Sequence, residues 1–549
     1  MRTLPEALHD AAHSGEGLTF VVDGVDTRRT YADLEQSALG VAGAIVQAGL
    51  TAGDLLALVI ADAESFLTAL LGASIAGVAP ALLYPPAANS DLCQYFTTTA
   101  AVLRAIGARA VVTSSTLVTG FEAVRGSCPE LALVLSRDDL HGSPFQPAGP
   151  PSLDDVAFVQ FTSGSTSAPR GVMLSHRNLS ANIDAINGPA GLNTSPHDSA
   201  VSWLPLYHDM GLVGMTLGPL YAGRPGVLLP PQTFAKRPAE WLKAISRYRA
   251  TVSFAPNFAY DLAVRRVKDR DLESIDLSCW RIAGCGSEPI SAATLAAFVE
   301  RFAGVGFRAE SMFPCYGLAE HVLAATLPSR DRPLHLEHVA IDQLVTGRQA
   351  VIAEAGQPSL TLVGCGQALP GHELRIVDDA GRAVGEREVG EIALSGPSVM
   401  LGYYGDDEAT RQNIRDGWLY TGDLGFTTDG ELFLCGRLKD IIIVNGRKYH
   451  PQDLESAAAE VLGVRRGGVV AFGTVVPGAS ERIVMVVERS SAAAAAAEGV
   501  VDAIRRRLGD LFGLYVDDVV LVPNGTIGRT TSGKVRRAAT RAQYLDGGW

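Results

Sequence analysis

The fold is decided by the stretch Val156-Ala-Phe-Val-Gln-Phe-Thr-Ser-Gly-Ser-Thr-Ser-Ala-Pro-Arg-Gly171. Its first six residues form a short, mostly apolar run, which is typical of a buried parallel strand. A loop rich in glycine and hydroxyl residues follows, and the segment from Asn178 to Ile183 has the pattern of the start of a helix. Strand, loop and helix in this order indicate an α/β unit.

The same alternation extends outward along most of the chain. Three further short apolar runs lie between helix-like segments, at Leu55–Ile60, Ala110–Thr113 and Leu131–Leu135. Alternating strands and helices predict doubly wound sheets with right-handed crossovers. Past Gly364 the pattern changes, and turn residues separate strand-like runs that include Glu373–Val377 and Gly390–Leu394. This change predicts a small β-rich subdomain at about 364–437.

Beyond Arg437 the pattern is that of a compact α+β unit. We expect strands and helices in the order strand Asp440–Val444, helix Pro451–Leu462, strand Ile483–Val487, a helix from the alanine run Ala492–Ala497 to about Leu511, and strand Val519–Pro523. The chain of 549 residues is too long for one hydrophobic core. We therefore expect an N-terminal domain at 1–437 and a small C-terminal domain at 438–549.

Composition excludes several classes of function. Hydrophobic residues make up 47% and charged residues 19%, as in ordinary globular proteins. The net charge of −13 argues against sequence-independent binding of nucleic acid. One local basic patch lies near the end of the chain, at Arg529, Lys534, Arg536, Arg537 and Arg541.

Cysteine spacing and hydropathy indicate a cytoplasmic protein without a membrane span. The seven cysteines include no C-x-x-C pair, so they are interpreted as reduced thiols. The N-terminus lacks the order of a signal peptide. Ser65–Pro86 is uncharged and long enough to cross a bilayer, but it contains three prolines and two glycines. A buried helix followed by a strand fits this segment better.

The loop at Thr162-Ser163-Gly164-Ser165-Thr166 suits a polyphosphate. Glycine lets the backbone expose its N–H groups, the hydroxyls add donors, and Arg170 adds a fixed charge. A Ser/Gly-rich surface linker is the competing interpretation. The loop lacks the lysine of a P-loop, and a second stretch of similar spacing, ending at Gly533-Lys534, continues with Val535 instead of a hydroxyl residue.

With its context, this loop resembles the signature of the adenylate-forming superfamily, which contains acyl-CoA synthetases, peptide-synthetase adenylation domains and luciferases. Further motifs follow in the order typical of that family: Pro205-Leu-Tyr-His-Asp-Met-Gly211, Tyr316-Gly-Leu-Ala-Glu320, Gly417-Trp-Leu-Tyr-Thr-Gly-Asp-Leu424, Gly436-Arg-Leu-Lys-Asp440 and Arg529-Thr-Thr-Ser-Gly-Lys534. The resemblance covers nearly the whole chain. It implies an enzyme that uses ATP and Mg²⁺ to convert a carboxylic acid into an acyl-AMP.

The resemblance also implies roles for individual residues. Tyr316 stacks on adenine, Asp423 accepts hydrogen bonds from the ribose, and Arg437 contacts ribose or phosphate. Glu320 and Thr166 are the implied magnesium ligands. The implied nucleotide site consists of Thr162, Ser163, Gly164, Ser165, Thr166, Gly286, Ser287, Tyr316, Gly317, Asp423, Arg437 and Lys534.

Lys534, Glu320 and His208 are the implied catalytic residues. An ammonium group at Lys534 bridges the substrate carboxylate and the α-phosphate, where negative charge gathers. Lys439 matches the hinge position of the family. The pair His208-Asp209 also suggests a proton relay or a metal, but His208 is interpreted as shaping the boundary between acyl and nucleotide sites. His321 is interpreted as structural.

Within the superfamily, the chain most resembles the fatty acyl-AMP ligases, which pass acyl groups to carrier proteins. Ser167-Ala-Pro-Arg170 stands where acyl-CoA synthetases typically have Gly-x-Pro-Lys. Leu334–Glu354 resembles an insertion that braces the C-terminal domain and disfavours the CoA-accepting arrangement. The carrier protein must act in trans, because the chain ends soon after Lys534.

Three alternatives stay open at this level. They are an acyl-CoA ligase for a bulky or aromatic acid, a peptide-synthetase domain, and a relative that binds acyl-AMP without making it. The sequence does not specify the chain length of the acid, the carrier partner, the pathway or the oligomeric state.

Overall fold

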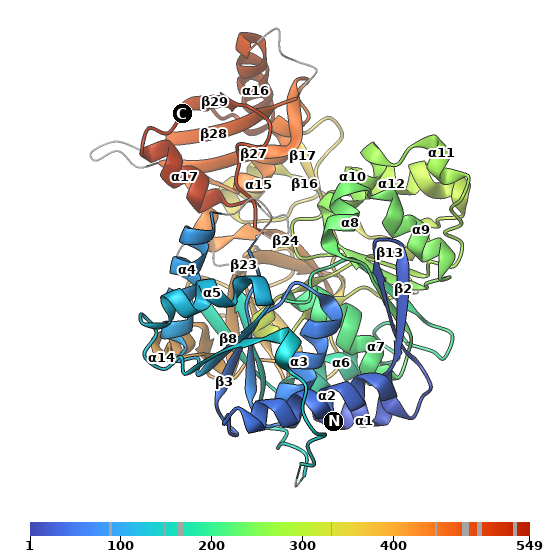
Figure 1. Cartoon of the computed structure of the whole chain (residues 1–549). Helices are drawn as coiled ribbons and strands as arrows, with labels where there is room; N and C mark the ends of the chain where they lie inside the picture. Colours follow the sequence, from blue (N-terminus) through green and yellow to red (C-terminus); the bar gives the residue numbers. More distant parts are fainter. Residues whose placement is uncertain are drawn as a thin grey trace.

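The structure is a computed structural model that describes residues 1–86, 91–147, 149–162, 170–330, 332–444, 447–474, 482–490, 497–530 and 535–549. Two seven-stranded sheets form the larger part of the molecule, and a smaller C-terminal unit lies above them in Figure 1. The arrangement is the predicted α/β fold with several sheets. The Ser163–Thr166 loop and Lys534 lie outside the described residues.

One large sheet is built around the stretch that decides the fold. Its strand order is β21-β8-β7-β4-β3-β5-β6, with bounds Gly402–Tyr403, Arg170–Ser175, Val156–Thr162, Ala79–Leu82, Leu55–Val59, Ala110–Thr113 and Leu133–Ser136. β3 to β7 run parallel, which confirms the predicted strands within two residues. The helices α3 (Ala63–Ile75), α4 (Leu92–Ala105) and α5 (Ser115–Arg125) connect them. As predicted, Ser65–Pro86 is a helix followed by a strand, and the described residues contain no helix long and apolar enough to cross a membrane.

Strand β8 is an element that the sequence did not predict. It returns antiparallel to β7, with Thr162 opposite Arg170, so the two strands form a hairpin. Only a short apolar run, Gly171–Leu174, separates the loop from the capped helix α6 (His176–Asn187). Such a run is equally compatible with the first turn of a helix. The hairpin fixes both ends of the loop on neighbouring strands.

The second large sheet has the order β13-β12-β11-β9-β10-β1-β2, with bounds Met312–Pro314, Ile282–Cys285, Val252–Ala255, Ala200–Ser202, Gly226–Leu228, Gly17–Val22 and Val25–Thr30. All strands are parallel except the edge strand β2. Helices α8 (Pro231–Lys236), α9 (Ala239–Arg247), α10 (Asn257–Arg266) and α12 (Ala292–Phe302) cover this sheet with an aromatic-rich core.

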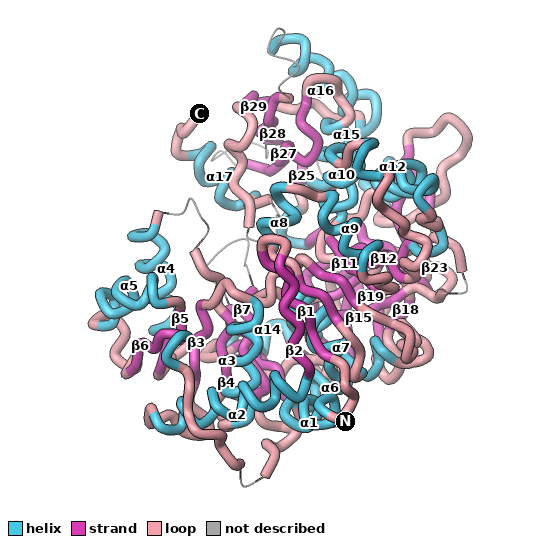
Figure 2. The backbone as a smooth tube through the Cα atoms, turned by 45° about the vertical axis from the view of Figure 1, so that its right-hand side comes forward, coloured by secondary structure: helices cyan, strands magenta, loops and turns pink. Residues whose placement is uncertain are grey.

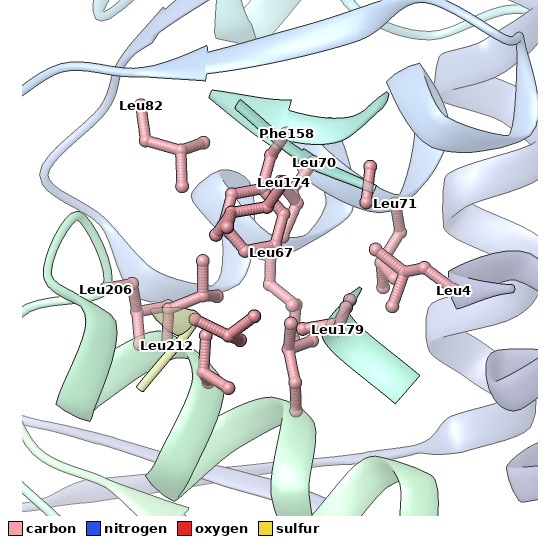
Figure 3. Close-up of a cluster of buried hydrophobic side chains, with 14 of the residues drawn as sticks. Leu4, Leu67, Leu70, Leu71, Leu82, Phe158, Leu174, Leu179, Leu206 and Leu212 are labelled. Atoms are coloured by element: carbon pink, nitrogen blue, oxygen red, sulfur yellow. The ribbon is translucent and has the colours of Figure 1, made fainter. Parts of the chain in front are cut away.

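The two sheets share one continuous core. Figure 3 shows Leu67 of α3, Phe158 of β7, Leu174 of β8 and Leu179 of α6 packed together. All four side chains are fully buried. Burying one such side chain contributes about 1.5–3 kcal/mol, so the β7–β8 hairpin is held by its own hydrophobic residues. The helices α1 (Leu4–Ala12), α2 (Tyr31–Gln47) and α7 (Gly218–Ala222) complete this core.

A five-stranded antiparallel sheet corresponds to the predicted β-rich part. It comprises β19 (Glu373–Val377), β20 (Gly390–Ser395), β22 (Ile414–Arg415), β23 (Trp418–Thr428) and β24 (Glu431–Arg437). β19 matches its predicted bounds, and β20 is one residue longer than predicted. Pairing of β23 with β24 sets Asp423 opposite Arg437. The sheet thereby brings two of the predicted site residues into contact.

Within residues 442–545, three strands form a separate sheet on which helices pack. β27 (Val464–Thr474), β28 (Arg482–Arg489) and β29 (Asp518–Val522) pair in that order, and α15 (Pro451–Ala459), α16 (Ala497–Phe512) and α17 (Arg537–Leu545) pack on them. The short strands β25 (Ile442–Val444) and β26 (Arg447–Tyr449) precede them. We call residues 438–549 the C-terminal module, and both views show it above the large sheets (Figures 1 and 2). The predicted elements occur in the predicted order, although α15 ends three residues early, and the sequence did not predict β26, β27 or α17.

The segment resembling an insertion packs against the C-terminal module. β16 (Leu336–Ala340) pairs with β17 (Ser359–Val363), and α13 (Ile341–Gly347) lies between them in the chain. Ile341 and Val345 of α13 are buried in one cluster with Ile442, Tyr449 and Leu454 of the module. Glu337 of β16 forms a two-pronged ion pair with Arg387, at 2.9 and 3.2 Å. The insertion is thus attached to the sheet at one end and to the module at the other.

Replacing Ile341 with alanine should loosen this attachment. Ile341 is 3% exposed, so the truncation removes buried methyl groups and is expected to cost about 2–5 kcal/mol. Ile352→Ala in the same insertion is the matched control, because Ile352 is 60% exposed and surface changes shift stability by only about 0.5 kcal/mol. Hydrogen exchange in α13 and β26 measures the difference. Equal exchange in the two variants would contradict the packing described.

Candidate active site

The predicted site residues converge on a cleft of about 1780 Å³ between the sheets and the C-terminal module. Each predicted site residue with a described side chain lines it, namely His208, Gly286, Ser287, Tyr316, Gly317, Glu320, Asp423, Arg437 and Lys439. Thr162 is described only as the last residue of β7. Arg170, across the hairpin from Thr162, also lines the cleft. The two ends of the β7–β8 hairpin therefore lie beside this cleft.

A chain of three side chains crosses the cleft wall. The Tyr316 hydroxyl, from β14 (Tyr316–Gly317), donates to Asp423 Oδ2 at 2.8 Å. Arg437 Nε lies 2.7 Å from Asp423 Oδ1. Burial, and next the charge of Asp423, raise the pKa of Tyr316 well above its usual value. The Asp423 carboxylate raises the pKa of Arg437. Both shifts favour a neutral Tyr316 hydroxyl and a charged Arg437 guanidinium on either side of Asp423.

Glu320 presents a carboxylate to the same cleft. Burial, the largest cause, raises its pKa. Its Oε1 accepts a hydrogen bond from Tyr403 at 3.0 Å, and its carbonyl accepts one from Met400 N at 2.9 Å. Arg170 lies over the Tyr403 ring, 5.2 Å from the centroid. Tyr403 was not predicted as a site residue, because its short strand β21 carries no chemical motif and only the sheet brings it to Glu320.

The backbone around Glu320 is held in an unusual conformation. Val322 has φ 65° and ψ −62°, and Leu323 N donates to His321 O at 2.8 Å, which closes a tight three-residue turn. A positive φ is a genuine outlier for a β-branched residue and is maintained only where the surroundings enforce it. A Cβ at Gly317 would lie 1.8 Å from Leu323 O. The turn thus folds back onto the Tyr316 motif and requires glycine there.

The loop after β12 supplies a second strained residue. Ser287 has φ 72°, and a Cβ at the preceding Gly286 would lie 3.0 Å from Cys315 O. Glu288 Oε1 accepts a hydrogen bond from Phe258 N at 2.6 Å, which ties the loop to α10. The loop lies at the carboxyl end of a parallel strand, where open α/β sheets bind their ligands.

His208 lies at the entrance of a π-helix, η2 (Met210–Leu217), an element that is frequent at functional sites. The carboxylate of Asp209 accepts a hydrogen bond from Met210 N at 2.7 Å. Among the described residues no group of three or more His, Cys, Asp or Glu side chains could hold a metal ion.

Part of the cleft lining is apolar. Ile186, Leu192, Phe254, Leu323 and Leu327 line this part. They belong to one hydrophobic cluster or pack against it. A surface of this kind accepts hydrocarbon and offers few partners for polar groups.

Lys439 also lines the cleft and lies in the 3-10 turn η6 (Leu438–Asp440) that follows β24. Burial, and next the neighbouring Arg437, lower the pKa of Lys439. A Cβ at Gly436 would lie 2.7 Å from His450 Nδ1, so the chain passes close to the C-terminal module here. Lys439 therefore lies where the chain passes from the antiparallel sheet into the C-terminal module.

Comparisons with known proteins agree with this geometry. A solved structure from structural and functional studies of fatty acyl-adenylate ligases from E. coli and L. pneumophila is 37% identical, with a TM-score of 0.93 over 100% of this chain and 98% of that chain. A putative acyl-CoA synthetase of Caulobacter vibrioides is 36% identical over 99% of this chain and 96% of its own length. The medium-chain-fatty-acid–acyl-carrier-protein ligase of Moorena producens is 37% identical over 72% of this chain and 68% of its own length.

Family comparison covers both parts of the chain. Residues 439–548 match the AMP domain of the Disco-interacting protein 2-like family. Residues 8–404 match the AMP-binding enzyme family. This range includes the β7–β8 hairpin, the Tyr316 motif and Glu320. Because this family model matches most of the chain and a relative is 36% identical over 99% of it, the chain belongs to the AMP-binding enzyme family.

Proposed function

We propose that this enzyme uses Mg-ATP to convert a fatty acid into an acyl-AMP and then transfers the acyl group to an acyl carrier protein. The observation that carries the proposal is the Tyr316–Asp423–Arg437 chain beside Glu320, in a cleft that apolar side chains also line. Such a cleft could hold both a nucleotide and a hydrocarbon chain.

The nucleotide is assigned to the polar region. Tyr316 offers a flat aromatic face to adenine, and Asp423 accepts hydrogen bonds from ribose hydroxyls through its remaining lone pairs. Arg437 is paired with Asp423 and adds a positive charge near the phosphates. The loop at Ser163–Thr166 is assigned to the β- and γ-phosphates, since both of its ends lie beside the cleft.

Glu320 is the residue that would hold Mg²⁺. Its carboxylate lines the cleft and receives one hydrogen bond from a neutral hydroxyl, from Tyr403. Magnesium is usually bound by one or two carboxylates plus phosphates and water, so a single acidic residue fits. When bound, the ion would neutralise charge on the phosphates. Tyr403 orients the carboxylate, and Arg170 keeps the Tyr403 ring in place.

The reaction is assigned to the α-phosphate. One oxygen of the acid attacks phosphorus, the bond to the β-phosphate breaks, and pyrophosphate leaves. Lys534 is assigned to stabilise the negative charge that develops there, and His208 to separate the acyl region from the nucleotide. The apolar walls at Leu192 and Leu327 suit an alkyl chain. The reaction is placed in the cytoplasm, where the seven free cysteines would stay reduced.

A carrier protein in trans is proposed as the acceptor. Residues 438–549 are taken as a lid domain that pivots near Lys439. The burial of Ile341 and Val345 in the core of the module supports a brace against such rotation. On this proposal, the brace disfavours transfer to free CoA. The named activity of the Moorena producens relative supports the same acceptor.

Lys534→Ala is expected to lower acid-dependent exchange of labelled pyrophosphate into ATP by at least about 100-fold, because a charge aimed at the transition state is lost. Binding of a non-hydrolysable acyl-AMP mimic should be retained. An acyl-AMP-binding relative without adenylating activity would show no exchange even with Lys534 in place. Unchanged exchange in the variant would refute the role assigned to Lys534.

Asp423→Asn should raise the KM for ATP by about tenfold or more, since hydrogen bonds to a charged group contribute roughly 1.5–3 kcal/mol. The kcat should change less, because the ribose contacts are made in the ground state as well. Asp407→Asn is the control, because it removes the same charge from an exposed residue of α14 (Asp407–Asn413). Equal KM values for the two variants would exclude the ribose role.

Competition between acceptors tests the second half of the proposal. Purified enzyme with ATP, a fatty acid and equal concentrations of carrier protein and CoA should load the carrier protein at least about tenfold faster. Ile341→Ala should increase the share of acyl-CoA relative to Ile352→Ala, because only the first change weakens the brace. Formation of acyl-CoA as fast as acyl-carrier protein in the unmodified enzyme would favour an acyl-CoA ligase.

A further inference from the structure

Glu488 of β28 is a fully buried carboxylate that the proposed mechanism does not use. Its Oε1 accepts two backbone hydrogen bonds, from Gly525 N at 2.8 Å and from Ile527 N at 2.9 Å. Its Oε2 is paired with Arg465 of β27. Each carboxylate oxygen therefore has a specific partner.

A charge in this position is costly unless it is fully compensated. Transfer of an ionised carboxylate from water into the protein interior costs several kcal/mol, which only well-aligned partners offset. The close approach of Glu488 also requires glycine at 468, where a Cβ would lie 2.8 Å from both the Cβ and Oε2 of Glu488. The surroundings of Glu488 are thus shaped to hold a carboxylate against one particular backbone segment.

That segment is the first arm of a hairpin-like stem. Arg529 pairs with Val535 in an antiparallel bridge, and Arg536 N donates to Gly528 O at 2.9 Å. Ile527 is buried in the outer core of the module, and Val535 packs against the same cluster. Lys534 directly precedes Val535, so the stem described here flanks the lysine in sequence.

The second arm is anchored as well. Arg537 is paired with Glu455 of α15 at 2.8 Å. In the first arm, Arg529 also donates to Gly467 O. The carboxylate of Glu488 is fully buried and holds the first arm by accepting hydrogen bonds from its backbone. Motion of Gly525 and Ile527 away from it would leave a buried carboxylate with unfilled acceptor positions.

We propose that Glu488 is a positioning residue for Lys534, acting through the stem formed by residues 525–529 and 535–537. It does not contact the substrate. It fixes the stem residues Arg529 and Val535, which line the cleft on either side of the segment that carries Lys534, and so sets the accuracy with which the ammonium group meets the α-phosphate. This inference rests on the role proposed for Lys534.

The test is the variant Glu488→Gln, which keeps the shape but removes the charge that faces Arg465. The kcat of acid-dependent pyrophosphate exchange should fall roughly 10- to 100-fold, because small displacements of a reacting group have effects of this size. The KM values for ATP and acid should stay within about twofold, since the residues proposed to bind both substrates, Tyr316, Asp423 and Leu192, lie outside this stem. Asp517→Asn is the matched control, because Asp517 also binds a backbone amide of β28, that of Ile483.

A double-mutant cycle separates positioning from mere stability. In a Lys534→Ala background, Glu488→Gln should cause no further loss of residual exchange, since its effect passes through the lysine. An additive loss, or an equal loss in Asp517→Asn, would overturn the proposal. If Lys534→Ala itself has no effect, the proposed function of Lys534 fails, whatever the result at Glu488.

A second variant covers the case in which Glu488→Gln does not fold. Arg465→Met removes the counter-ion and leaves both amide hydrogen bonds, and the side chain of Arg465 is one-third exposed. It should lower kcat several-fold without raising either KM, and the loss should disappear in the Lys534→Ala background. A loss that persists there would also overturn the proposal.

Discussion

The candidate site depends on one carboxylate, that of Asp423, and on what it holds together. One oxygen of Asp423 receives the Tyr316 hydroxyl, and the other faces Arg437. Tyr316 follows the second large sheet, whereas Asp423 and Arg437 lie on paired strands of the antiparallel sheet. The contact therefore joins two sheets at the wall of the cleft, and it fixes both the aromatic face and the positive charge on which nucleotide binding would depend.

The surrounding structure serves to keep this junction in register with the rest of the cleft. The tight turn at Val322 directs the chain from the Tyr316 motif past Glu320, and Tyr403 reaches Glu320 from the first large sheet. The insertion attaches the C-terminal module through Ile341. Within the module, Glu488 fixes the stem that flanks Lys534. Each of these contacts joins segments that are far apart in the sequence.

Local patterns predict much of the fold but few of these contacts. The helix and strand within Ser65–Pro86 and the strands β5 and β19 follow from hydrophobic periodicity, because burial decides them. β8 could not be predicted in this way, since its short apolar run also fits the adjoining helix. The predicted residues around Tyr316 and Glu320 came from motif resemblance, and those with described side chains line one cleft. The roles assigned to them stay predictions.

Tyr403 and Glu488 illustrate what a single sequence does not contain. Tyr403 lies in a two-residue strand, and Glu488 follows the apolar run Ile483–Val487 near the end of β28, where a carboxylate usually faces solvent. Their importance depends on which backbone or side chain lies opposite, and pairing across sheets decides that. The strain at Ser287 and Val322 is hidden for the same reason, because neither residue type signals a positive φ.

The central claim is that a carboxylate oxygen attacks the α-phosphate of ATP. A fatty acid labelled with ¹⁸O in its carboxyl group tests this directly, when the enzyme turns over with ATP and an acceptor and the products are analysed by mass spectrometry. Acyl-AMP formation followed by acyl transfer leaves one labelled oxygen in AMP. Label in phosphate or pyrophosphate, or AMP without label, would contradict the account.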